Sequence, residues 1–112
     1  MHALRLYLFD RLVERRAELV ALAGDIPGTS IVGSTDIVPI IASEVRALQP
    51  DVIVVGLHPN DGVGPGLVAD LRGDCPAATI IVLAEYAQTR FGTYCASAGA
   101  DHVVPRDARL DT

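Results

Sequence analysis

Two short, uninterrupted runs of apolar and mostly β-branched residues constrain the fold of this chain more than any other feature. They are Asp51–Val55, with the sequence DVIVV, and Ala78–Leu83, with the sequence ATIIVL. A strand with water on one face alternates apolar and polar residues, whereas a strand covered on both faces is apolar throughout and is typical of a parallel sheet. The two runs therefore predict strands of a parallel sheet that is covered on both faces.

Three further segments are typical of strands, and segments of helical periodicity lie between all five. The additional strands are expected at Ala3–Asp10, Thr29–Gly33 and His102–Val104. The residues expected to face inward on the four helices are Leu12, Leu19, Val20 and Ala23; Ile37, Ile40, Ile41, Val45 and Leu48; Leu67, Val68 and Leu71; and Phe91, Tyr94, Cys95 and Ala98. Alternating strands and helices of this length require right-handed crossovers, so the chain is predicted to be a three-layer, doubly wound α/β domain.

Proline and glycine positions indicate where the helices begin and end. Pro39 and Pro65 suit the first turn of a helix, because a missing N–H does little harm there. Pro50 requires the second helix to end by Gln49, because the residue before a proline disfavours helical backbone. Gly73 is the expected end of the third helix.

The length of 112 residues predicts a single domain over residues 1–112. Such a chain buries enough surface to fold without a disulfide or a metal ion. Cys75 and Cys95 match no metal-binding spacing, and we expect two reduced thiols in a cytoplasmic protein. The apolar runs are far shorter than the ~20 residues that a bilayer requires, so no membrane partner is expected.

The formal net charge of −5 argues against a nucleic-acid partner, because proteins that bind the phosphate backbone are normally basic. Aromatic residues make up only 4% of the chain, too few for a platform that stacks single-stranded bases. All nine basic residues are arginine, so any mechanism that requires a lysine is excluded.

Ligands of doubly wound folds bind beyond the carboxyl ends of the parallel strands. The residues expected at that edge are Asp10, Arg11, Gly56, Leu57, His58, Ala84, Glu85 and Arg106. The turn after the first strand reads FDRL and contains no glycine, so a dinucleotide-binding fingerprint is absent from its usual place.

Three stretches carry a resemblance to a known family. They are Pro50–Gly64 (PDVIVVGLHPNDGVG), Thr79–Tyr86 (TIIVLAEY) and Ala98–Asp107 (AGADHVVPRD). In order and spacing they resemble the receiver domain of bacterial two-component response regulators, where the corresponding stretches commonly read PDVVLLDLRLPDGSG, VIVLTAY and AGADGFVPKD. The similarity covers about residues 3 to 107 and implies a flavodoxin-like sheet with strand order 2-1-3-4-5.

The resemblance implies a phosphorylation site whose functional positions are mostly changed. A receiver takes a phosphoryl group onto an aspartate at the end of the third strand, beside a Mg²⁺ ion that two acidic residues hold. A hydroxyl residue, a lysine and an aromatic switch residue complete the site. The corresponding positions here are Gly56 for the acceptor, Asp10 and Arg11 for the acidic pair, Ala84 for the hydroxyl, Arg106 for the lysine and Val103 for the switch.

Glycine has no nucleophilic side chain, so an acyl phosphate cannot form at Gly56. A single carboxylate beside two guanidinium groups is a poor Mg²⁺ site, so no metal, cofactor or catalytic residue is expected. We expect Arg11 or Arg106 to take the place of the metal and to pair with Asp10. The alternative is that Asp10 only caps the first helix and Arg11 is a surface charge.

A receiver normally ends in a fifth helix, and only five residues follow Asp107 here. We therefore expect the fifth helix to be missing or truncated, because five residues do not form a stable helix. A fragment of a longer regulator explains this as well as a complete chain does. In a complete chain, a partner or a second copy covers the bare surface; we expect a homodimer through the face of strands four and five, or strand exchange.

The favoured function is an atypical receiver domain that regulates by phosphorylation-independent protein–protein interaction, with a signalling protein or sensor kinase as partner. One alternative is a receiver whose acceptor has moved to Asp61 or Asp51. Asp51 begins its strand, at the end opposite the expected site. Another alternative is a domain that binds a small ligand in a pocket near Gly56, lined by Asp10, His58 and Arg106.

Overall fold

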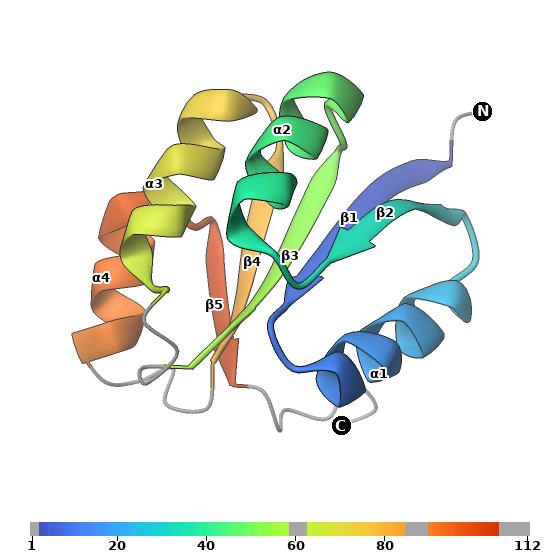
Figure 1. Cartoon of the computed structure of the whole chain (residues 1–112), viewed down its shortest axis with the longest axis horizontal. Helices are drawn as coiled ribbons and strands as arrows, with labels where there is room; N and C mark the ends of the chain where they lie inside the picture. Colours follow the sequence, from blue (N-terminus) through green and yellow to red (C-terminus); the bar gives the residue numbers. More distant parts are fainter. Residues whose placement is uncertain (1–2, 59–62, 85–89, 106–112) are drawn as a thin grey trace.

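The computed structural model describes residues 3–58, 63–84 and 90–105 and contains one parallel sheet (Figure 1). Its strands are β1 (Leu4–Asp10), β2 (Thr29–Thr35), β3 (Val52–Leu57), β4 (Thr79–Ala84) and β5 (His102–Pro105). The strand order is β2-β1-β3-β4-β5, and every pairing is parallel. The predicted α/β class, strand order and five strands are confirmed. The expected fifth helix falls on residues 106–112, outside the described residues.

Helices alternate with the strands as predicted. They are α1 (Val13–Gly24), α2 (Val38–Leu48), α3 (Pro65–Asp74) and α4 (Arg90–Ala98). Pro39 and Pro65 lie in the first turns of α2 and α3. Gln49 adopts left-handed backbone with φ of 46°, which ends α2 directly before Pro50. None of the described helices is long and apolar enough to cross a bilayer.

The two faces of the sheet carry separate clusters of buried side chains. The larger cluster joins alternate strand residues such as Phe9, Ile53 and Val82 to side chains of α2, α3 and α4. The smaller cluster joins Leu6 and Leu8 to α1. Figure 1 shows the same division, with α2, α3 and α4 together and α1 apart from them beside β1 and β2. Three described helices therefore cover one face and a single helix covers part of the other.

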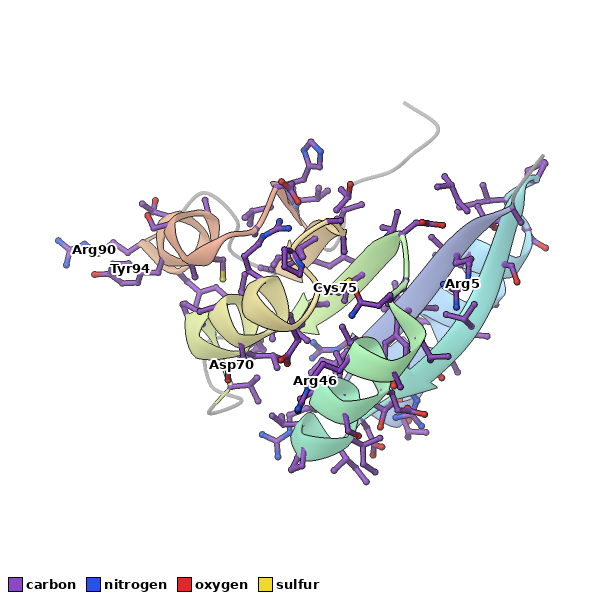
Figure 2. All side chains as sticks on the ribbon, turned by 90° about the horizontal axis from the view of Figure 1, so that it is seen from above. Arg5, Arg46, Asp70, Cys75, Arg90 and Tyr94 are labelled. Carbon is purple, nitrogen blue, oxygen red and sulfur yellow. The ribbon has the colours of Figure 1, made fainter. Side chains whose placement is uncertain are left out.

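Several residues expected to face inward are exposed, and helix position explains each. Leu12 and Ile37 directly precede α1 and α2 and have extended backbone. Neither side chain therefore lies on the apolar side of the helix that follows it. Ile40 lies in the first turn of α2 and is 40% exposed. Tyr94 is 56% exposed, because the side of α4 that is buried contains Gly92 and Cys95 instead. Figure 2 shows Tyr94 and Arg90 pointing away from the body of the protein. The end of α3 was also misplaced, because the helix continues through Gly73 to Asp74.

A buried tyrosine ties β1, β2 and α2 together. Tyr7 is fully buried, and its hydroxyl donates a short hydrogen bond to the carboxylate of Glu44 on α2. Burial, with the nearby Glu44 carboxylate, raises the pKa of the Tyr7 hydroxyl, so the tyrosine stays protonated. The register between β1 and β2 shifts at this point, so that Tyr7 pairs with Gly33 and β2 has one extra residue, Val32.

Arg72 makes hydrogen bonds that join several segments at the amino-terminal edge of the sheet, where the parallel strands begin. Its guanidinium donates to the carbonyl oxygens of Gly99, Pro76 and Ala78 and to the carboxylate of Asp101 at 2.6 Å. Asp101 also accepts the backbone N–H of Ile80 at 2.8 Å. The aspartate of the AGAD motif therefore has a structural role here: it joins the start of β4 to the turn before β5.

Gly33→Ala is expected to destabilise the protein by about 1–3 kcal/mol, because overpacking a core contact forces its neighbours to shift. A Cβ at Gly33 meets Cε2 of the buried Tyr7 ring at 2.6 Å. The measurement is the free energy of unfolding from urea denaturation. Gly24→Ala is the matched control, because a Cβ at Gly24 meets nothing within 4 Å. Equal stability of the two variants would show that the Tyr7 ring moves aside without cost.

The network at Asp101 predicts a stability that depends on pH. The Ile80 N–H and then the Arg72 guanidinium lower the pKa of the Asp101 carboxyl in the folded state. Its contribution is therefore complete above the pKa of the unfolded state and is lost as the pH falls through the folded-state pKa. We expect Asp101→Asn to lower the urea midpoint at about pH 7 and to have little effect at about pH 2.

Asp70→Asn on the outer side of α3, labelled in Figure 2, is the control for that experiment and leaves the midpoint unchanged at both pH values. An Asp101→Asn variant with the same deficit at acid and neutral pH would instead assign the effect to the shape of the side chain rather than to its charge.

Candidate functional site

The strand register brings three of the predicted site positions to one edge of the sheet. Asp10 at the end of β1 pairs with Gly56 in β3, and Gly56 pairs with Leu83 in β4. Ala84, the last residue of β4, pairs with Leu57. Registered partners in a parallel sheet project on the same face, so Asp10, Gly56 and Leu83 form one row. The only carboxylate in this row is that of Asp10.

Asp10 is a buried acid with a defined local role. Its side chain is 1% exposed, and Oδ1 accepts the backbone N–H of Leu12 at 3.0 Å. This bond spans two residues and closes the turn that leads into α1, as Asx turns do. The predicted capping role is close to what is observed: the carboxylate bonds the residue before α1 instead of a helical N–H. A pairing with Arg11 or Arg106 stays a prediction.

Arg11 is exposed and lies on the wall of an open groove of approximately 530 Å³ beside this edge. The groove is lined by Arg11, Asp36, Ile37, Val38, Pro39 and Val63. Asp36 is also within 3.4 Å of the Arg16 guanidinium. Among the predicted ligand-pocket residues, Asp10 and His58 are not part of this lining, and Arg106 lies outside the described residues.

The remaining predicted positions are apolar or lie outside the described residues. Ala84 is fully buried and offers no hydroxyl group. Val103 pairs with Val82 and packs against the larger core cluster. Asp61, the loop aspartate considered as a relocated acceptor, is outside the described part of the chain. Asp51 accepts the backbone N–H of Arg5 at 2.8 Å, at the amino-terminal edge of the sheet.

The groups that could hold a metal or act as nucleophiles are sparse. Within residues 3–58, 63–84 and 90–105, no three His, Cys, Asp or Glu side chains gather as metal ligands. Cys75 and Cys95 are both free and buried. Burial raises the pKa of both thiols, which keeps them protonated and poorly reactive.

Sequence reasoning missed one feature of this edge. The groove wall formed by the start of α2 was not expected, because Ile37 was assigned to the inward stripe. Its exposure follows from the helix beginning one residue later, which the capping residue Thr35 could have indicated. The Thr35 hydroxyl accepts the backbone N–H of Ile37 at 3.2 Å, as Asp10 does for Leu12.

The comparisons with known proteins are structural rather than sequence-based. Neither a protein-family model nor a curated protein sequence matches the chain. The receiver domain of RcsB from Salmonella enterica superposes with a TM-score of 0.83 at 16% identity, over 96% of this chain and 80% of that one. The response-regulator domain of Thermotoga maritima CheB gives a TM-score of 0.82 at 16% identity, over 97% and 84%.

A LuxR-family response regulator from an Aurantimonas species is similar at 22% identity, with a TM-score of 0.82 over 93% of this chain and 74% of that one. At these identities the similarity establishes the fold. The chain therefore has the fold of a response-regulator receiver domain, as the three sequence stretches implied.

Asp10 can stabilise the fold as a hydrogen-bond acceptor or through its negative charge, and two substitutions distinguish these two contributions. We expect Asp10→Ala to cost about 1–2 kcal/mol of unfolding free energy, because the Leu12 N–H loses its acceptor. Asp10→Asn keeps an Oδ1 acceptor and should restore most of that loss. If Asp10→Asn is as unstable as Asp10→Ala in urea denaturation, the negative charge is what matters and an arginine partner is favoured over the turn.

Proposed function

We propose that this chain is a receiver-type signalling module that acts through protein contacts and does not accept a phosphoryl group. The single observation that carries the proposal is the row Asp10–Gly56–Leu83 at the carboxyl edge of the sheet. The place beside Asp10, on the neighbouring strand, is occupied by a residue without a side chain. An acyl phosphate requires a carboxylate, and glycine supplies none.

The groups that would support phosphoryl transfer are also changed. Ala84 ends β4 where a hydroxyl would contact phosphoryl oxygens. Arg11 follows Asp10 where a second acid would hold Mg²⁺. Phosphoryl transfer depends on a metal and on donors that neutralise developing charge, so losing the nucleophile together with these groups removes the reaction in all its parts.

A structural neighbour shows the contrast. A response regulator from Burkholderia pseudomallei, with a TM-score of 0.77 at 23% identity over 96% of this chain and 62% of that one, was solved with a phosphorylated aspartic acid and a calcium ion. The same fold therefore carries the chemistry in that protein. We infer that this chain keeps the scaffold for recognition and has no phosphorylation switch.

A relocated acceptor at Asp51 has little support. Asp51 lies before β3, whereas Asp10 and Gly56 lie toward the carboxyl ends of their strands. Its carboxylate is engaged by the Arg5 N–H. The predicted homodimer stays a prediction, and sedimentation at micromolar concentration tests it, since a monomer alone would contradict it.

The direct test is incubation with acetyl phosphate and Mg²⁺, followed by intact-mass measurement. We expect no phosphorylated species, whereas a receiver with an intact site, treated in parallel, becomes labelled. We also expect no Mg²⁺ binding by calorimetry. Acid-labile phosphate on the wild-type chain, at any aspartate, would overturn the proposal.

The double variant Gly56→Asp, Arg11→Asp is the matched control for metal binding, because it places three carboxylates at one edge. We expect it to bind Mg²⁺ where the wild-type chain does not, provided that circular dichroism shows it folded. Equal Mg²⁺ affinity in the two proteins would show that these positions do not form the metal site.

A further inference from the structure

We propose that the outer edge of β2, together with the adjoining flank of α1, binds a second copy of this chain. The flank, here called the β2-side flank, consists of Val13, Ala17, Val20 and Gly24 of α1. The two β2 strands pair antiparallel across a two-fold axis, and the two α1 helices pack side by side over them. This inference rests on the proposed function as a protein-interaction module and names one partner, a second copy of the domain.

β2 ends the sheet, with β1 on one side and no strand of the described residues on the other. The Leu4 N–H donates to the Gly28 carbonyl oxygen, and Leu4 pairs with Thr29. This pattern directs the backbone groups of Ser30 toward β1. Successive residues of a strand direct these groups to opposite edges, so those of Thr29 and Ile31 point away from β1. Such groups at a sheet edge are a template for another strand.

The edge is accessible and uncharged. β2 has the sequence TSIVGST, and only its last residue, Thr35, is buried, whereas β1, of the same length between two strands, has five buried residues. Native edge strands are commonly protected by charge, proline or short length, and β2 has none of these. Its one irregularity, the extra residue Val32, follows the regular pairing of Thr29–Ile31. The strand therefore offers a free edge to a partner.

The β2-side flank continues this edge on the side of the sheet that α1 covers. Ala23 is buried against the sheet, and the flank lies about 60–120° from Ala23 around the helix. Because the β1-α1-β2 crossover is right-handed, that direction points past β2 and away from β1. The ion pair between Arg16 and Asp36, which directly follows β2, has the same orientation. Strand edge and helix flank therefore form one continuous surface.

The β2-side flank is apolar, small and without charge. Val13 is 63% exposed, and two of the other three residues are alanine and glycine. The acidic residues of this region point elsewhere: Glu14, Glu18 and Asp25 lie about 180–220° from Ala23, away from the sheet. A second copy packed on the flank therefore meets apolar surface and brings no like charges into the contact.

A two-fold axis perpendicular to the sheet joins both parts of the surface at once. It makes the β2 strands antiparallel and keeps the two α1 helices on the same side of the joined sheet. α1 packs over β1 and β2, as Figure 1 shows, so its axis lies about half a strand spacing inside β2. With strands about 4.8 Å apart, the two helix axes lie roughly 10 Å apart. Packed helices are about 8–10 Å apart, so the two flanks come into contact.

The helix flank selects a second copy over an isolated strand of another protein. An added strand alone would pair with the outward backbone groups of Thr29 and Ile31 but would leave Val13 exposed. A second copy supplies a strand and a helix flank at the spacing that its own fold sets. The net charge of −5 on each chain does not oppose this contact directly, because neither β2 nor the flank carries a charge.

No segment outside the described residues is attached to β2. Residues 1–2 precede β1, and residues 59–62, 85–89 and 106–112 follow β3, β4 and β5. β5 lies at the opposite end of the strand order. Seven extended residues span at most about 25 Å, and the five strand spacings from β5 to a position outside β2 take about 24 Å. Residues 106–112 are therefore too few to run along the β2 edge as an added strand.

Sedimentation equilibrium of the intact chain at micromolar concentrations measures the dimer and its dissociation constant. Ala17→Glu places a carboxylate on the β2-side flank near the middle of α1, where the two-fold axis opposes it to its copy. Ala21→Glu is the matched control, because Ala21 lies about 160° from Ala23, on the side of α1 away from the sheet. Both alanines are exposed, so both variants are expected to fold, which circular dichroism checks. We expect a wild-type dimer whose dissociation constant rises about tenfold or more in Ala17→Glu and less than about twofold in Ala21→Glu.

Charge rescue identifies the contact as one between copies. Ala17→Arg is expected to weaken the dimer as Ala17→Glu does, because the axis again opposes like charges. An equimolar mixture of the two variants is expected to form a mixed dimer at least about tenfold tighter than either variant alone, because the axis then brings opposite charges together.

Amide hydrogen exchange tests the strand pairing separately from the helix contact. The Ile31 N–H points away from β1 and is expected to exchange at least about tenfold more slowly above the dissociation constant than below it. The Ser30 N–H, which the register directs toward β1, is the internal control and is expected to change less than about twofold.

Four results would overturn the inference. One is a wild-type monomer at every concentration, and another is equal weakening by Ala17→Glu and Ala21→Glu. The third is a dimer that Ala17→Glu leaves intact, since this assigns the contact to another surface, such as the face of β4 and β5. The fourth is a dimer in which exchange of the Ile31 N–H does not depend on concentration. Failure of the underlying function is separate, because it appears as phosphate labelling whatever the oligomeric state.

Discussion

The central strands of a parallel sheet must be shielded from water on both sides, and the rest of this structure follows from how that requirement is met. On one side, α2, α3 and α4 bury Phe9, Ile53, Val55 and Val82 almost completely. On the other side, α1 shields Leu6 and Leu8, while Val54 and Ile81 are only half-buried. The hydrophobic effect is proportional to the apolar area removed from water, so among the described residues the first side contributes more to stability than the second.

At the carboxyl edge of the sheet, the buried Asp10 carboxylate has a structural role. The resemblance implies a metal-binding acid at Asp10, and the Asp10 carboxylate accepts the hydrogen bond from the Leu12 N–H that shapes the start of α1. A buried carboxylate with a backbone donor is costly to remove even where no metal is bound, because the donor would lose its acceptor. Gly56 pairs with Asp10 on one side and Leu83 on the other, and this pairing is made by the backbone, so it requires no side chain at that position.

Local sequence signals predicted most of the architecture. The features that they did not predict depend on contacts between residues far apart in the sequence. The continuous runs at β3 and β4, and the prolines at α2 and α3, fixed element type and order because each depends on neighbouring residues alone. The extra residue Val32 in β2 depends on the Tyr7 ring lying opposite Gly33, which no local pattern contains. The AGAD stretch was informative as a resemblance, but the role of Asp101 depends on Arg72, which lies 29 positions away.

The sequence predicted where the residues of the candidate site lie in the sheet, but it did not predict which contacts they make. The resemblance placed Asp10, Gly56 and Ala84 at one edge because the carboxyl ends of parallel strands lie at the same edge of a sheet. It did not predict that Ile37 would leave the core and form a groove wall with Arg11, since that follows from where α2 begins. Helix starts are determined by single side-chain hydrogen bonds, such as that from the Ile37 N–H to Thr35, which pattern counting does not weigh.

If the chain accepts no phosphoryl group, as we propose, its regulation comes from something other than covalent chemistry. Any ligand shifts a conformational equilibrium only by its difference in affinity for the two states. Phosphorylation supplies that difference through a new charge at the carboxyl edge, and in the row Asp10–Gly56–Leu83 the residue Gly56 has no side chain to carry it. The remaining source is a partner that binds one conformation better than another, and an apolar surface serves this purpose because its affinity changes with the area it exposes. Under the proposed function, the concentration of the partner rather than the phosphorylation state of the domain determines when the signal is present.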